Sequence, residues 1–78
     1  MWIRPSDYKV VGNCLAVARK RAGLTQKELS RRLRKPQSFI SSYERGQRRI
    51  DIIEFLLIAD AIGAKPRKLF ASVLAARG

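Results

Sequence analysis

The chain has no histidine, a single cysteine and only six acidic residues among its 78. Histidine is the most frequent general base and metal ligand near neutral pH, so its absence removes the commonest catalytic and metal-binding arrangements. Cys14 alone can form neither an internal disulfide nor a thiolate cluster, and we interpret it as a packing residue. The sequence also has no glycine-rich phosphate loop and no acidic pair spaced to share a site. We therefore expect no enzymatic activity, no cofactor and no metal site.

Long apolar runs are missing as well, and no segment approaches the roughly 20 apolar residues of a membrane-spanning helix. The first residues, MWIRPSDYK, lack the apolar centre and the small-residue cleavage site of a signal peptide. A basic amphipathic helix with bulky aromatics on its other face, which would favour a membrane surface, is not evident either. These absences favour a protein of the reducing cytoplasm without a membrane partner.

What the chain has in excess is positive charge, because 17 lysines and arginines against six acids give a net charge of +11. The segment from Arg19 to Arg49 holds eleven basic residues and two acids, whereas Ile50 to Ala64 holds three acids and no base. A run of charge by itself usually marks a solvated surface. Here the charge is gathered on one segment and reversed on the next, which favours a polyanionic partner such as nucleic acid.

The basic segment carries the signals of two short helices. Thr25 and Glu28 form a capping box that predicts a helix start at Thr25. Leu29 and Leu33 are four positions apart and lie on one face of that helix. Pro36 cannot continue the helix but suits the first turn of a new one, so a second helix is expected to start near it.

This second helix has an apolar stripe opposite a face of small polar residues. The stripe is Phe39, Ile40 and Tyr43, and the polar face is Gln37, Ser38, Ser41 and Ser42. Exposed helices usually carry lysine and glutamate on such a face. Glutamine and serine can donate and accept hydrogen bonds and are short enough to let a helix approach base edges.

Periodicity predicts a long helix before this pair. Residues 5–7 end a tail and provide a cap, after which apolar residues recur every three or four positions from Tyr8 to Ala22. Gly12 lies inside this helix at a cost of about 1 kcal/mol relative to alanine. Gly23 is the expected C-terminal cap.

A fourth helix follows the pair and is apolar on almost every side. Asp51 and Glu54 predict its start, and Gly63 ends it. We expect its core side to consist of Ile52, Phe55, Ala59 and Ile62, flanked by Leu56 and Ile58. Ile53 and Leu57 then project outward and need cover from the last helix or from a second subunit.

Pro66 starts the last helix, and its apolar face is formed by Leu69, Phe70, Val73 and Leu74. The chain is thus predicted to be all-α with five helices, as an N-terminal tail over residues 1–6 and a single domain over residues 7–76. A domain of this size is only marginally stable alone, so dimerisation would help. The expected dimer or partner face comprises Ile53, Leu57, Phe70 and Leu74.

Several of these motifs are shared with a known family. They are Arg19, GLTQKEL from Gly23, PQSFIS from Pro36, YERG from Tyr43 and the apolar run ending in AIG at Gly63. Together they resemble the Cro and phage-repressor type of bacterial regulator, the xenobiotic-response-element-like family. The resemblance covers about Leu15 to Leu69 and implies a compact five-helix, lambda-repressor-like domain whose second and third helices form a helix-turn-helix.

Two positions depart from the family pattern. Arg34 stands where the turn between the helices usually has glycine, so this arginine is expected to adopt a positive φ. Pro36 replaces the serine or threonine that usually caps the recognition helix.

The resemblance implies a role for each matched position. Base edges would be read by Gln37, Ser38 and Ser42. The DNA backbone would be contacted by Gln26, Lys27, Lys35, Ser41, Arg45, Gln47, Arg48 and Arg49. Arg19 and Glu44 would form a structural ion pair. The amide of Gln37 could bind N6 and N7 of adenine together, a contact that discriminates between bases by about 1 to 3 kcal/mol.

The function predicted from the sequence is therefore a regulator that binds specific double-stranded DNA, in the bacterial cytoplasm and on the nucleoid when bound. It would act as a repressor and as a homodimer on a near-palindromic operator. We expect Gln37→Ala to lose discrimination at one base position. We expect Arg48→Ala to weaken binding to all sequences alike and to flatten the salt dependence by about one unit.

Two alternatives stay open. Small proteins of this family also act as antitoxins, which bind a toxin through a second surface and autoregulate their operon. Residues 1–7 and the patch around Ile53, Leu57 and the last helix could supply such a surface for a protein partner. The chain could also be the DNA-binding domain of a longer sensor.

Overall fold

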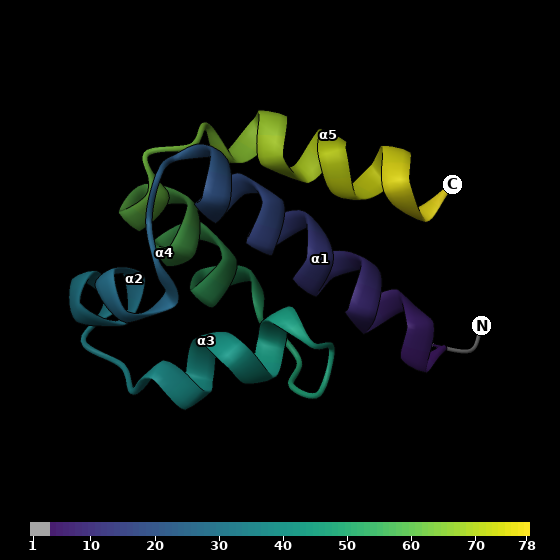
Figure 1. Ribbon diagram of the computed structural model, residues 1–78. Coiled ribbons are helices and arrows are strands. Elements are labelled where there is room, and N and C mark those ends of the chain that lie inside the picture. Colours follow the sequence, from purple (N-terminus) through teal and green to yellow (C-terminus); the bar gives the residue numbers. More distant parts are fainter. Residues whose placement is uncertain (1–3) are drawn as a thin grey trace.

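The computed structural model describes residues 4–78, and within this range the chain forms five α-helices and no strand (Figure 1). The helices are α1 (Pro5–Arg21), α2 (Gln26–Leu33), α3 (Gln37–Glu44), α4 (Ile52–Ile62) and α5 (Pro66–Arg77). The long α1 packs between α5 and α3, while α2 packs against α3 and α4. The prediction of an all-α domain with five helices is confirmed. None of these five helices is long and apolar enough to cross a membrane.

The first helix begins earlier than the boundary expected between tail and domain. Pro5 is its first residue and Arg4 is the N-cap. Asp7 accepts a hydrogen bond from the backbone nitrogen of Arg4 at 3.0 Å, so it closes the first turn from inside the helix. Proline suits the first helical position because it has no N–H to leave unpaired there. The helical part therefore starts at residue 5, and Trp2 and Ile3 lie outside the described residues.

The starts of α2 and α4 follow their capping boxes. The Thr25 hydroxyl accepts from the backbone nitrogen of Glu28 at 3.1 Å, and the Glu28 carboxylate accepts from that of Thr25 at 3.1 Å. The same exchange joins Asp51 and Glu54, at 2.7 and 3.0 Å. Arg34, which ends α2, has a φ of 55°, so the expected left-handed residue in the turn is confirmed.

The core lies where the five helices meet, and α5 contributes Leu69 to it. Its fully buried large side chains are Leu15, Leu29, Ile40, Tyr43 and Ile58. Burial raises the pKa of the Tyr43 hydroxyl, which finds no hydrogen-bond partner among residues 4–78. Ile40 and Tyr43 lie three positions apart and turn one side of α3 inward. The opposite side of α3 is thereby fixed toward solvent.

One part of the predicted core is wrong. Ile52, assigned to the core side of α4, is 64% exposed, whereas Ile58, assigned to its flank, is 1% exposed. The buried stripe is formed by Phe55, Ile58, Ala59 and Ile62, at i, i+3, i+4 and i+7. Ile52 sits beside this stripe in the first turn. A helix that is apolar on every side gives no periodicity from which its buried side can be chosen.

Candidate nucleic-acid interface

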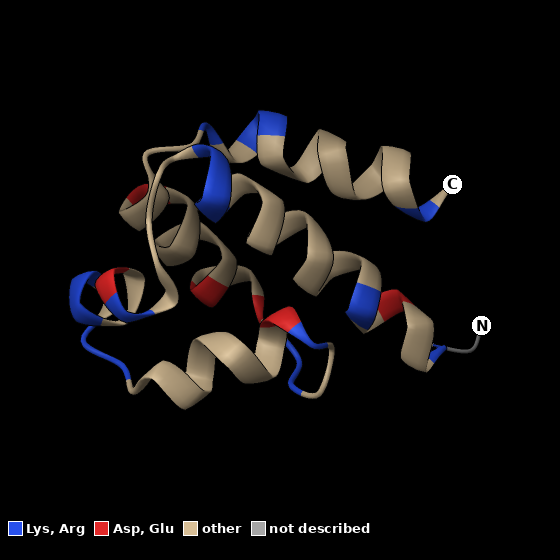
Figure 2. Ribbon diagram, in the orientation of Figure 1, with Lys and Arg blue, Asp and Glu red and all other residues tan. Residues whose placement is uncertain are grey.

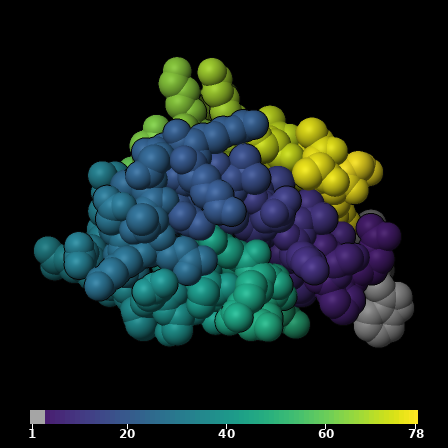
Figure 3. Space-filling view, viewed as in Figure 1, coloured from purple at the N-terminus to yellow at the C-terminus, as the bar shows by residue number. Residues whose placement is uncertain are grey.

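The side of α3 opposite the core presents neutral polar groups. Gln37 and Ser38 are exposed, and Ser41 and Ser42 are half-buried. This uncharged stretch of α3 runs between two basic loops, residues 34–35 before it and residues 45–49 after it (Figure 2). Seen from the same side, α2, the turn and α3 form a continuous surface (Figure 3). The arrangement offers hydrogen bonding in the middle and positive charge at both ends.

Most cations around α3 have no acidic partner. Lys35 precedes the helix, Arg45 and Arg49 follow it, and Lys27 projects from α2; all four side chains are exposed. None of the four forms an ion pair with a carboxylate in the described range 4–78. Their charge is therefore free to be compensated by an external anion such as a phosphate.

The loop after α3 is fixed to the helix by backbone hydrogen bonds. The nitrogen of Arg45 donates to the oxygen of Ser41 at 3.1 Å, and that of Gln47 donates to Ser42 at 2.9 Å. These bonds satisfy carbonyl groups at the end of the helix, which otherwise have no partner. As a result, the exposed side chains of Arg45 and Gln47 are held close to the polar face of α3.

Arg48 differs from the other cations of this loop. Its guanidinium donates to the two carboxylate oxygens of Glu54, at 3.1 and 2.8 Å, and lies 4.5 Å from the centre of the Phe39 ring. The bonds from Arg48 hold the pKa of Glu54 below its usual range. Since Glu54 also caps α4, Arg48 ties α3 to the start of α4. Arg48→Ala would therefore also disturb the connection between α3 and α4, so Arg45, which has no acidic partner among residues 4–78, is the better position at which to test phosphate contact.

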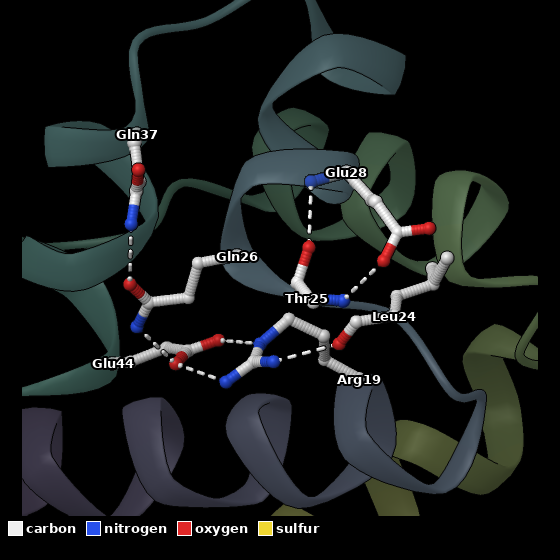
Figure 4. Close-up of polar contacts among 7 residues, drawn as sticks. All are labelled: Arg19, Leu24, Thr25, Gln26, Glu28, Gln37 and Glu44. Carbon is white, nitrogen blue, oxygen red and sulfur yellow. Dashed lines mark hydrogen bonds and ion pairs between the residues drawn. The ribbon is translucent and has the colours of Figure 1, made fainter.

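A buried ion pair joins the end of α1 to the end of α3 (Figure 4). Arg19 donates from Nε to Glu44 Oε2 at 2.7 Å and from Nη2 to Oε1 at 3.1 Å. Its third nitrogen, Nη1, donates to the backbone oxygen of Leu24 at 2.7 Å. The side chains of Arg19 and Glu44 are only 8% and 6% exposed. The hydrogen bonds to Glu44 raise the pKa of Arg19, and both charges are compensated inside the fold.

Two glutamines extend this ion pair to the surface. Gln26, the first residue of α2, donates from Nε2 to Glu44 Oε1 at 2.9 Å. Gln37, the first residue of α3, donates from Nε2 to Gln26 Oε1 at 3.3 Å. The sequence placed Gln26 against phosphate and Gln37 against bases but did not predict their contact. The signal available was that both residues follow the cap of a helix, eleven positions apart.

Comparison with known proteins gives this geometry a family. A helix-turn-helix family model matches residues 15–69. Over 55 residues the chain is 40% identical to the uncharacterized HTH-type transcriptional regulator y4dJ of Sinorhizobium fredii, covering 70% of this chain and 71% of the relative. The chain belongs to the Cro/C1-type, or XRE, family of helix-turn-helix transcriptional regulators.

Solved structures of two other proteins are similar to this XRE-family chain. An XRE-family like protein from Pseudomonas syringae pv. tomato is 43% identical, with a TM-score of 0.79 over 90% of this chain and 85% of the other. The restriction-modification controller protein C.AhdI from Aeromonas hydrophila is 32% identical, with a TM-score of 0.77 over 83% of this chain and 98% of the other. The similarity thus extends beyond the motif to α1 and α5.

The XRE-family chain also exposes apolar side chains away from α3. Ile53 and Leu57 on α4 are 61% and 54% exposed, and Phe70 and Leu74 on α5 are 50% and 56% exposed. The last helix packs against α4 through Phe55 and Phe70 but leaves Ile53 and Leu57 exposed, so the expectation that it covers these two side chains is wrong. Two further side chains of this surface, Ile52 and Leu56, are exposed although the sequence does not predict it, and they line a hollow between α4 and α5 together with Phe70. We call these six side chains the α4–α5 apolar face.

Proposed function

We propose that this XRE-family regulator binds double-stranded DNA sequence-specifically by placing α3 in the major groove, and that it represses transcription by occluding a promoter. The observation that carries the proposal is the neutral, hydrogen-bonding face of α3 with unpaired cations at both ends. Neutral donor and acceptor groups suit base edges, while cations suit the phosphates on either side of a groove. Such a regulator would act in the bacterial cytoplasm.

Base reading is assigned to Gln37, Ser38 and Ser42. Contact with the DNA backbone is assigned to Gln26, Lys27, Lys35, Ser41, Arg45, Gln47 and Arg49. Arg48 is assigned to the same group, although its guanidinium is also held by Glu54. Fixed backbone amides and exposed cations position a protein on DNA without sensing sequence, whereas groove-facing amides and hydroxyls do sense it. The two sets therefore make separable predictions.

Gln37→Ala is expected to lower discrimination at one base position by about 1 to 3 kcal/mol and to leave the salt dependence unchanged, because it removes no charge. Arg45→Ala is expected to weaken binding to all duplexes alike and to reduce the slope of log K against log salt concentration by about one unit. Fluorescence anisotropy titrations at several salt concentrations measure both quantities. The assignment fails if the two variants change discrimination and slope in the same way.

We further propose that the second copy of a homodimer covers the α4–α5 apolar face. Exposed apolar side chains gathered on two neighbouring helices of a small domain are typical of an interface. α4 carries two acids and no base, while α5 carries Arg67, Lys68 and Arg77, so this face is less strongly cationic than the α3 side. A two-fold dimer places its two recognition helices about 34 Å apart, on successive major grooves of a near-palindromic site.

Ile53→Asp is expected to convert the dimer to a monomer and to lower operator affinity, because it places a charge in the proposed interface while leaving the core intact. Val17→Asp on α1 is the matched control, since Val17 is also a partly exposed apolar residue, at 39%. Analytical ultracentrifugation of both variants gives the assembly state. A wild-type chain that remains monomeric at operator-saturating concentrations would remove the dimer from the proposal.

The proposed function is tested by selecting random duplexes with the purified protein and sequencing the bound pool. A two-fold related motif with half-sites about one helical turn apart would support dimeric, specific readout. An unenriched pool with strongly salt-dependent binding would mean that the positive surface binds DNA generically. The α4–α5 apolar face would then be assigned to a protein partner, as in an antitoxin.

A further inference from the structure

We propose that the buried Glu44 acts through Gln26 to fix the amide orientation of Gln37, and thereby makes this residue select adenine over guanine. The inference rests on the proposed function, because it concerns how Gln37 reads a base. Glu44 would be a positioning residue that never touches DNA. Hydrogen bonds are donated in sequence from Gln37 to Gln26 and from Gln26 to Glu44, and Arg19 donates to the same carboxylate (Figure 4).

The chain of bonds starts from a group that can only accept. Glu44 is 6% exposed and its two carboxylate oxygens take hydrogen bonds from Arg19. An ionised carboxylate has no proton to donate. Gln26 must therefore turn its NH2 group toward Glu44, as observed at 2.9 Å. A reversed Gln26 would place its own oxygen against a buried negative charge.

This constraint passes to the next amide. Because its nitrogen is held by Glu44, the atom that Gln26 presents to Gln37 is its oxygen. Gln37 must in turn direct its NH2 group to that oxygen, as observed at 3.3 Å. The two ends of an amide are nearly equal in shape, so polarity of this kind has to come from bonding partners. The buried charge on α3 thus determines which atoms Gln37 has free at the surface.

The free atoms are the carbonyl oxygen and one N–H of Gln37. Adenine presents a donor at N6 and an acceptor at N7 in the major groove, which match this pair of atoms. Guanine presents two acceptors, O6 and N7, and would meet the oxygen of Gln37 with an oxygen of its own. A reversed Gln37 would instead bond Gln26 through its oxygen and offer two N–H groups, which match guanine. The orientation set by Glu44 therefore discriminates between the two purines.

Two variants test this at the base position that Gln37→Ala identifies. Gln26→Met removes the amide that transmits the orientation and leaves the Arg19–Glu44 pair in place. Glu44→Gln gives the buried end of the chain a group that can donate, so the two surface amides can reverse. Both are expected to lower the preference for adenine over guanine by about tenfold, against the wild-type protein on matched duplexes. Circular dichroism at the titration temperature shows that each variant is folded.

The ratio of the two affinities separates this proposal from its alternatives. If Glu44 only supports the fold, Glu44→Gln weakens binding to both duplexes equally and the ratio is unchanged, which overturns the proposal. An unchanged ratio in Gln26→Met also overturns it, while Gln37→Ala still abolishes the preference and the proposed function stands. If Gln37→Ala alters no base position, base reading by Gln37 fails and this inference fails with it.

Discussion

Gly12→Ala is expected to lower the free energy of unfolding by about 3 kcal/mol or more, although alanine is the better helix former. A Cβ atom on Gly12 would overlap the backbone oxygen of Tyr43 and lie 2.8 Å from that of Glu44. These atoms belong to the last turn of α3 and cannot rotate away as a side chain can. The two helices would have to separate, and the buried Tyr43 and the Arg19–Glu44 pair would lose their packing.

Urea unfolding followed by circular dichroism, at one fixed protein concentration, measures this effect. Asn13→Ala is the matched control, because Asn13 is the exposed neighbour in the same helix. It is expected to leave stability unchanged or to raise it by a few tenths of a kcal/mol through helix propensity. A Gly12→Ala variant as stable as the wild type would show that α1 and α3 do not pack this closely.

Breaking the buried ion pair is expected to have an effect of similar size. Arg19→Met leaves the carboxylate of Glu44 without its charge partner, and Glu44→Leu does the same to the guanidinium of Arg19. Each single change is expected to cost about 3 to 5 kcal/mol, because a lone charge then stays at a site hidden from water. The double variant is expected to recover most of that loss, since two apolar side chains can fill the same space without a charge to compensate.

A double-mutant cycle measures the coupling between the two residues. Arg4→Ala serves as the control for an exposed ion pair, because Arg4 is 68% exposed where it meets Asp7 at 3.5 Å. It is expected to change stability little, as solvent screens such pairs. Single changes whose costs simply add in the double variant would mean that the buried pair contributes no coupling.

These two predictions also guide the DNA experiments. Gly12 lies at the α1–α3 contact and Arg19 is buried, so neither is expected to touch DNA. A variant at either position that loses DNA binding would report the loss of α3 positioning. Variants of Gln37 and Arg45, whose side chains are exposed, are expected to retain stability and to change recognition alone.

Local signals in the sequence were sufficient for the helices. Capping boxes depend on residues three positions apart. The boxes formed by Thr25 with Glu28 and by Asp51 with Glu54 could therefore be predicted without knowledge of any tertiary contact. The periodicity of α3 likewise predicted that Tyr43 faces the core. The family followed from motifs of the same local kind. What these signals establish is where helices begin and which short helices have one apolar side.

The tertiary structure decided the points at which distant residues meet. From the sequence alone, Gly12 is expected to destabilise α1 relative to alanine. The structure shows instead that the backbone of Tyr43 and Glu44 lies so close to Gly12 that there is no room for a Cβ atom. The sequence does not distinguish Arg48 from the other loop cations, whereas the structure shows that Arg48 is paired with Glu54.

By itself, then, the sequence determined five helices, a helix-turn-helix and a positive surface around it, because caps, periodicity and net charge act over a few residues. Only the tertiary structure decided which side of α4 is buried and that Gln37 is linked through Gln26 to Glu44. These depend on packing between α1, α2, α3 and α4. Packing brings together residues that are far apart in the sequence, and a local sequence pattern does not show which of them will be in contact.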